Sequence, residues 1–123
     1  GMAKEKKYLS QGPIHNVIKP LGFEKGLTKA KSLVLVEDYV SAIKVARVTP
    51  SCCLFGSTCP SDRLRRFHIL TDELVFWLDN DKASDAMWMA KTATMLGFKV
   101  KVVVTKYDPK VYNNDEIKEA LYS

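Results

Sequence analysis

The apolar residues from position 33 onward gather in short runs of four or five residues, and Lys101 interrupts the last of these runs. Four such runs are expected to be strands, at 33–36, 52–55, 74–78 and 100–104. In the first three runs the apolar residues are consecutive and do not alternate with polar ones, which is typical of strands that are covered on both faces. The pattern therefore predicts a sheet that lies between two layers of helices.

Between and after these runs, apolar residues recur at helical spacing. The predicted helices lie at 39–46, 60–67, 83–96 and 115–121. Asp38 is well placed as the N-cap of the first helix, and Gly97 as the C-terminal cap of the third. Alternation of apolar strands with helices predicts an α/β fold, in which an about four-stranded, mainly parallel sheet is flanked by helices on both faces.

Length and composition exclude several classes of protein. The chain has 123 residues, which is one domain at most. No apolar run approaches the ~20 residues of a membrane-spanning helix, and residues 1–20 lack the apolar core of a signal peptide. We therefore expect a cytoplasmic protein, or one in the host cytoplasm if the gene belongs to a phage. Its three cysteines, two of them adjacent, form no zinc-ligand pattern and are expected to be reduced thiols.

The positive charge is concentrated at the amino-terminal end of the chain. The formal net charge is +5, and residues 1–31 hold seven lysines against two glutamates. Residues 32–123 hold 12 basic and 12 acidic side chains. The chain is thus divided into a basic N-terminal arm or linker, 1–31, and a neutral domain, 32–123. A basic arm favours contact with a polyanion such as nucleic acid, with a solvated leader as the alternative.

Acidic residues follow two of the predicted strands. Glu37 and Asp38 come directly after the first strand, and Asp79 and Asp81 after the third. Ligands of open parallel sheets bind at the carboxyl ends of the strands, so adjacent strands would bring these carboxylates together. A cation would then be needed to offset their repulsion, and a few carboxylates with positions open for water and phosphate suit Mg²⁺. The alternative is that these residues are helix caps and surface acids.

The order of these motifs resembles the Toprim domain. The matching segments are 33–37 (Leu-Val-Leu-Val-Glu), 54–57 (Leu-Phe-Gly-Ser), 78–84 (Leu-Asp-Asn-Asp-Lys-Ala-Ser) and 106–112 (Lys-Tyr-Asp-Pro-Lys-Val-Tyr). Toprim is the catalytic domain shared by bacterial and phage primases, type IA and II topoisomerases and some nucleases, and the Asp-Pro stretch resembles phage-type primases most. The sequence departs from the family at Asp38 and Ser84, where the family usually has glycine.

The resemblance implies a Rossmann-like fold over 32–123 and metal-dependent nucleotidyl transfer, which makes RNA primers in phage or bacterial DNA replication. Asp79 and Asp81 would hold Mg²⁺ or Mn²⁺, and Glu37 would share a metal or act as general acid/base. Candidate contacts to nucleotide or nucleic acid are Gly56, Lys82, Arg63 and Arg66. The expected partners are a single-stranded DNA template, nucleoside triphosphates, and a replicative helicase or missing primase subdomains. The chain alone is expected to be weakly active or inactive.

Three other functions fit parts of the same pattern. A Toprim-like module could bind metal and nucleic acid without catalysis, or serve a topoisomerase or nuclease. A receiver domain of a response regulator also has acids after its first strand and an aspartate after its third, here Asp79. Thr105 and Lys106 could then correspond to its switch residues. The receiver pattern has five strand–helix units, however, and does not need Asp81.

Overall fold

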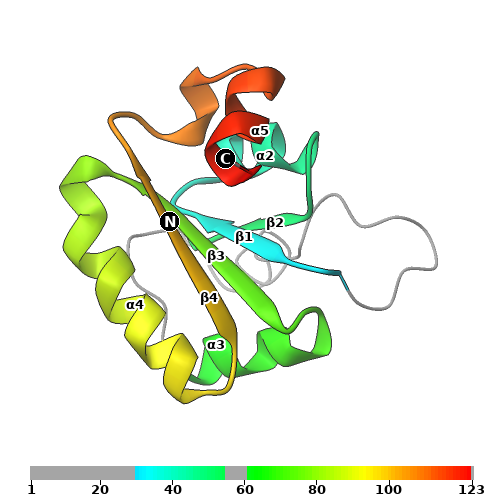
Figure 1. Cartoon of the computed structure of the whole chain (residues 1–123), viewed down its shortest axis with the longest axis vertical. Helices are drawn as coiled ribbons and strands as arrows, with labels where there is room; N and C mark the ends of the chain where they lie inside the picture. Colours follow the sequence, from blue (N-terminus) through cyan, green and yellow to red (C-terminus); the bar gives the residue numbers. More distant parts are fainter. Residues whose placement is uncertain (1–29, 55–60, 123) are drawn as a thin grey trace, which may run out of the picture.

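The computed structural model describes residues 30–54 and 61–122, and these residues form an α/β fold (Figure 1). The strands are β1 (Leu33–Val36), β2 (Ser51–Cys53), β3 (Glu73–Asp79) and β4 (Lys99–Thr105). The helices are α2 (Tyr39–Ala46), α3 (Ser61–Arg66), α4 (Ala83–Met95) and α5 (Asn114–Tyr122), with 3-10 turns η1 (Phe67–Ile69), η2 (Asn80–Lys82) and η3 (Pro109–Val111). The predicted fold class is confirmed. The predicted arm lies outside the described residues, except for Ala30 and Lys31.

All strand pairs of the four-stranded sheet are parallel, and the strand order is β2-β1-β3-β4. The chain leaves β1 toward one side to form β2, and then crosses to the other side of β1 to form β3. This reversal makes the carboxyl ends of β1 and β3 the switch point of the sheet, where ligands of such folds bind. The β3–β4 pair is the longest and runs in register from Glu73–Lys99 to Asp79–Thr105.

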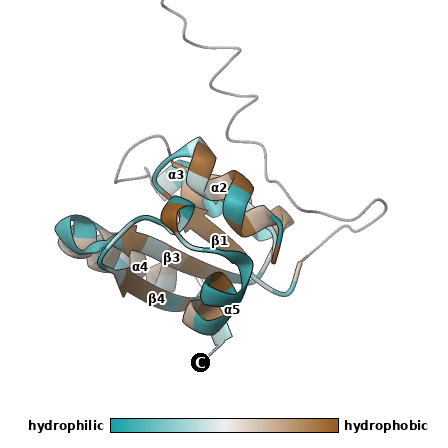
Figure 2. Cartoon of the chain, turned by 90° about the horizontal axis from the view of Figure 1, so that it is seen from above, coloured by the Kyte–Doolittle hydropathy of each residue, from teal (hydrophilic) through white to brown (hydrophobic). Residues whose placement is uncertain are grey.

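Helices cover the sheet on both faces, and each face has its own buried cluster. Leu33 and Leu35 of β1 belong to the cluster under α3 and α4, whereas Val34 and Val36 belong to the cluster under α2 and α5. All four side chains are at most 1% exposed. Burial on both faces explains why the strand sequences are apolar at consecutive positions. Figure 2 shows the strands in the hydrophobic colour, with hydrophilic residues on the outer side of α5.

Both predicted helix caps are confirmed. The Asp38 carboxylate accepts a hydrogen bond from the Ser41 amide at 2.8 Å and so caps α2. Gly97 follows α4 with a φ of +99°, a left-handed conformation that favours glycine. The structure differs from the prediction at β2, which covers Ser51–Cys53 and pairs with the short β1. Phe55, the last residue of the predicted strand, lies outside the described residues. No helix among the described residues is long and apolar enough to cross a membrane.

Candidate metal-binding site

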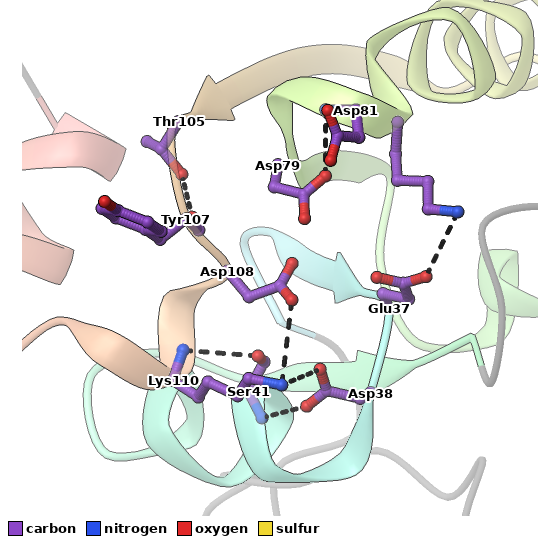
Figure 3. Close-up of polar contacts among 10 residues, drawn as sticks. Glu37, Asp38, Ser41, Asp79, Asp81, Thr105, Tyr107, Asp108 and Lys110 are labelled. Carbon is purple, nitrogen blue, oxygen red and sulfur yellow. Dashed lines mark hydrogen bonds and ion pairs between the residues drawn. The ribbon is translucent and has the colours of Figure 1, made fainter.

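Three carboxylates meet at the switch point of the sheet. Glu37 follows β1, Asp79 is the last residue of β3, and Asp108 comes from the turn between β4 and η3. One oxygen from each residue lies within 4.8 Å of the others, and Figure 3 shows the three side chains directed toward a common space. The parallel strands dictate this meeting, because they end at the same edge of the sheet.

Asp108 is brought to the site by hydrogen bonds that shape the turn after β4. The Thr105 hydroxyl, at the end of β4, accepts a hydrogen bond from the Trp77 indole at 2.8 Å and donates one to the Tyr107 carbonyl at 2.6 Å. Beyond Asp108, the Lys110 amide donates to the Ser41 hydroxyl at 3.3 Å. The turn is therefore fastened to β3 on one side and to α2 on the other.

Within residues 30–54 and 61–122, two lysines lie beside the carboxylates of the site. Lys82 Nζ lies 3.9 Å from the Glu37 carboxylate, and Lys110 Nζ lies 3.9 Å from that of Asp108. Lys110 is also 3.3 Å from Asp38, whose hydrogen bond and charge raise the pKa of the lysine. Two long contacts from exposed ammonium groups offset only part of the repulsion among three carboxylates.

Burial and mutual repulsion perturb the two carboxyls that lie deepest in the site. The pKa of Glu37 is raised, first by burial and then by the charge of Asp108. The pKa of Asp108 is raised by burial and by the charges of Asp79 and Asp38. The Asp108 side chain is 14% exposed, and its Oδ1 is buried with no hydrogen-bond partner among residues 30–54 and 61–122.

These properties fit a hard divalent cation. Mg²⁺ and Mn²⁺ prefer carboxylate oxygens and commonly keep several waters, so three carboxylates are a sufficient protein contribution. A cation among Glu37, Asp79 and Asp108 would provide the partner that Asp108 Oδ1 lacks and would offset their repulsion. Such an acidic group could hold a metal ion, and an expected Mg²⁺ or Mn²⁺ cofactor is compatible with its chemistry.

The structure separates the predicted pair of strand-end aspartates. Asp79 joins the acidic group, whereas Asp81 is exposed and is not part of it. The reason is local: the Asp79 carboxylate caps η2 by accepting a hydrogen bond from the Asp81 amide at 3.1 Å. Figure 3 shows Asp81 next to Asp79, on the side of Asp79 away from Asp108.

The predicted basic contacts have different positions. Lys82 lies at the site, next to Glu37. Arg63 and Arg66 belong to α3, which Figure 1 places at the opposite end of the sheet from the turn after β4, so the structure does not bring them to the carboxylates. Gly56 lies outside the described residues.

Sequence reasoning missed Asp108 as a member of the acidic group. The position of Asp108 in the sequence could have indicated this membership. It follows the fourth strand and therefore lies at the same sheet edge as Glu37 and Asp79. The Asp108-Pro109 motif was read as part of the resemblance, without a metal-binding role.

Comparisons of the chain with protein families, with curated proteins and with solved structures found no match.

Proposed function

We propose that this chain is the Toprim-type domain of a DNA primase and takes part in metal-dependent nucleotidyl transfer during primer synthesis. The observation that carries the proposal is the convergence of Glu37, Asp79 and Asp108 at the switch point of a parallel sheet. The motif resemblance supplies the reaction, and the acidic group supplies a site at which it could occur. The substrates would be nucleoside triphosphates and a single-stranded DNA template.

In this mechanism, a bound Mg²⁺ or Mn²⁺ would activate the attacking 3′-hydroxyl and neutralise charge on the leaving pyrophosphate. Asp79 and Asp108 would bind the metal, since their oxygens face the shared space and Asp108 Oδ1 has no hydrogen-bond partner among the described residues. Glu37 would bind beside them or take the proton of the hydroxyl. Its raised pKa brings it closer to the range of a general base.

The basic residues at the rim would contact phosphate. Lys82 and Lys110 have side chains that are 37% and 45% exposed, and each lies beside a carboxylate of the site. When a cation neutralises those carboxylates, the ammonium groups become available to the anionic triphosphate. Residues 32–123 are neutral in sum, so this part of the chain offers no excess of positive charge to a polyanion. A further primase subdomain or a helicase partner would therefore complete the binding groove.

One observation bears on the receiver alternative. In that reading, Thr105 would respond to phosphorylation of Asp79 by turning its hydroxyl toward the phosphate. The Thr105 hydroxyl instead donates to the Tyr107 carbonyl and accepts from the Trp77 indole. Asp108 further adds a negative charge where a phosphoryl group on Asp79 would lie. These contacts favour metal-dependent transfer over phosphorylation.

The metal site is tested by titrating Mn²⁺ and measuring paramagnetic relaxation of the protein. Asp79→Asn and Asp108→Asn should each weaken binding by about tenfold or more, because each removes one charged ligand of a loose site. Asp62→Asn is the matched control, since this exposed acid of α3 lies far from the cluster and should leave binding unchanged. Equal binding by all variants would place the metal elsewhere.

The reaction is tested by single-turnover primer extension with the missing primase subdomains restored. Glu37→Gln should lower the rate by about 10²–10⁴-fold while template binding persists, because the carboxylate would act on the transition state. A full rate in Glu37→Gln would refute the mechanism. Mn²⁺ binding without any primer extension by the reconstituted parent chain would instead identify a non-catalytic Toprim module.

A further inference from the structure

β4 lies at the edge of the sheet and leaves alternate backbone groups directed outward. Among residues 30–54 and 61–122 it pairs with β3 alone. The Lys99 amide donates to the Asp72 carbonyl at 2.9 Å, so the odd-numbered residues of β4 turn their peptide groups toward β3. In a parallel pair the intervening residues face the other way. The N–H and C=O groups of Val100, Val102 and Val104 therefore point to the open edge.

Apolar side chains surround this edge on the α4 side. A hollow between α4 and β4 is lined by Met87, Trp88, Val100 and Val102 among others. Trp88 is 52% exposed, and Met87 is 59% exposed. A half-exposed tryptophan beside an open strand edge is characteristic of a surface that binds another protein. The short β2, at the other edge of the sheet, offers only three residues.

In one antiparallel register of β4 with a second copy, all three outward-facing valines pair with one another. If a second copy pairs with β4 about an axis at Val102, then Val100 of one copy lies opposite Val104 of the other. All three outward-facing valines then exchange hydrogen bonds, and valine side chains face each other across the pair. Shifting the register by two residues, so that the axis lies at Lys101, would pair Val100 with Val102 but place Val104 opposite Phe98, outside the strand.

In the same register, Lys99 at the start of β4 lies near acidic residues of α5 in the second copy. Lys99 of one copy lies opposite Thr105 of the other, at a hollow that is also lined by Glu116 and Glu119 of α5. The exposed Lys99 would thus approach acidic residues of the second copy. Lys101 is drawn away from the edge, since its Nζ donates to the Leu121 carbonyl near the end of α5. The lysines of β4 therefore do not oppose this pairing.

We propose that this protein forms a homodimer through antiparallel pairing of β4 with β4 of a second copy. Pairing of the two β4 strands about an axis at Val102 joins two four-stranded sheets into one continuous sheet of eight strands. The α4 helices of both copies lie on the same face of that sheet, where Met87 and Trp88 lose exposure to water. A two-fold interface of this kind uses the same surface on both copies.

The oligomeric state of the full chain is measured by sedimentation velocity over a wide range of protein concentration. The parent chain should reach the mass of a dimer, and Val102→Pro should remain a monomer. Proline removes the N–H at the axis, yet this N–H makes no bond within the sheet, so the monomer fold tolerates it. Circular dichroism checks that the variant is folded. A parent chain that stays monomeric at every concentration would overturn the proposal.

Two further variants test the register independently of the proline. Under mild oxidation Val102→Cys should form an intermolecular disulfide, because directly opposed residues of a hydrogen-bonded pair have Cα atoms about 5.5 Å apart. Lys101→Cys should not cross-link, since its counterpart lies diagonally across the pair. The unmutated parent chain is the control for cross-linking through the native cysteines. Cross-linking of Lys101→Cys but not of Val102→Cys would refute the register.

A charge swap completes the test. Lys99→Glu should weaken the dimer by about threefold to tenfold, since it would face Glu116 and Glu119 of the second copy. Adding Glu119→Lys to the same chain should restore much of the affinity. Lys118→Glu is the control, because this exposed residue of α5 does not line the hollow. Failure of Lys99→Glu to change the dimer affinity more than Lys118→Glu does would contradict the proposed contact.

Discussion

The indole nitrogen of Trp77 donates a hydrogen bond to the hydroxyl of Thr105 at 2.8 Å, and so connects the buried strand β3 to the last residue of β4. The same hydroxyl donates to the Tyr107 carbonyl, which begins the turn toward Asp108. Trp77 is fully buried, so its position is fixed by the core. Through this contact, packing inside the sheet sets the position of a carboxylate at the candidate metal site.

Removing the hydroxyl of Thr105 should therefore affect both stability and metal binding. Thr105→Val leaves the buried Trp77 indole without its acceptor, and we expect a loss of about 1–3 kcal/mol in the free energy of unfolding, measured with urea. Mn²⁺ binding should also weaken, because the turn that carries Asp108 loses a contact. Thr94→Val is the control, since this residue of α4 is exposed and its hydroxyl donates to the Ala90 carbonyl of the same helix. Wild-type Mn²⁺ affinity in Thr105→Val would show that the turn holds Asp108 without this hydrogen bond.

Asp108→Asn should have opposite effects with and without metal. In the presence of a chelator the variant should melt at a higher temperature than the parent, because it removes one of three repelling carboxylates. With Mg²⁺ at ten times its dissociation constant, the parent should gain about 1.4 kcal/mol, and the variant should gain much less. Thermal melts in chelator and in Mg²⁺ measure both effects. If Mg²⁺ does not change the melting temperature of the parent chain, the proposed site does not bind it.

The raised pKa values of Glu37 and Asp108 predict how stability depends on pH. The folded state holds these protons more tightly than the unfolded state, in which the pKa values are near 4.5 and 3.8. In chelator, the contribution of these groups to stability should therefore decrease as the pH rises from those values through the raised ones. Mg²⁺ affinity should increase over the same range, because the metal competes with protons. Urea unfolding at several pH values tests the first trend, and Glu37→Gln combined with Asp108→Asn should flatten it.

Two substitutions at Asp38 separate its role as a helix cap from its ion pair. Asp38→Ala removes the acceptor for the Ser41 amide and should cost about 1 kcal/mol in the free energy of unfolding. Asp38→Asn keeps an acceptor for the cap but loses the charge beside Lys110, so it should cost less. Equal losses in both variants, measured by urea unfolding, would mean that the charge matters more than the cap.

Much of the fold could be read from local features of the sequence. Continuous apolar runs identified β1 and β3, because central strands of a parallel sheet are buried on both faces. The valines around Lys101 were enough to identify β4. Asp38 and Gly97 marked helix ends for reasons that lie within a few residues of the chain. The strand-end positions of Glu37 and Asp79 also followed from sequence, since any parallel sheet brings such positions to one edge.

The membership of the acidic group was decided by tertiary structure. Asp81 is closest to Asp79 along the chain, but a single hydrogen bond in η2 leaves it exposed. Asp108 is far from both Glu37 and Asp79 in sequence and joins them only because Thr105 and Ser41 hold its turn between β3 and α2. Contacts of this kind depend on strand order and on side chains from separate elements, and local pattern contains neither.

The open edge of β4 likewise depends on the strand order. The sequence Lys-Val-Lys-Val-Val-Val-Thr predicts a strand, but it does not say whether that strand has one neighbour or two. The order β2-β1-β3-β4 places it at the edge of the described sheet. The backbone groups of alternate valines therefore point away from β3, near the half-exposed Trp88. Amino-acid pattern thus determined which elements form, because burial and capping act locally. The assembled sheet determined which carboxylates and which edges meet, because these distances are set by packing between elements that are distant in the chain.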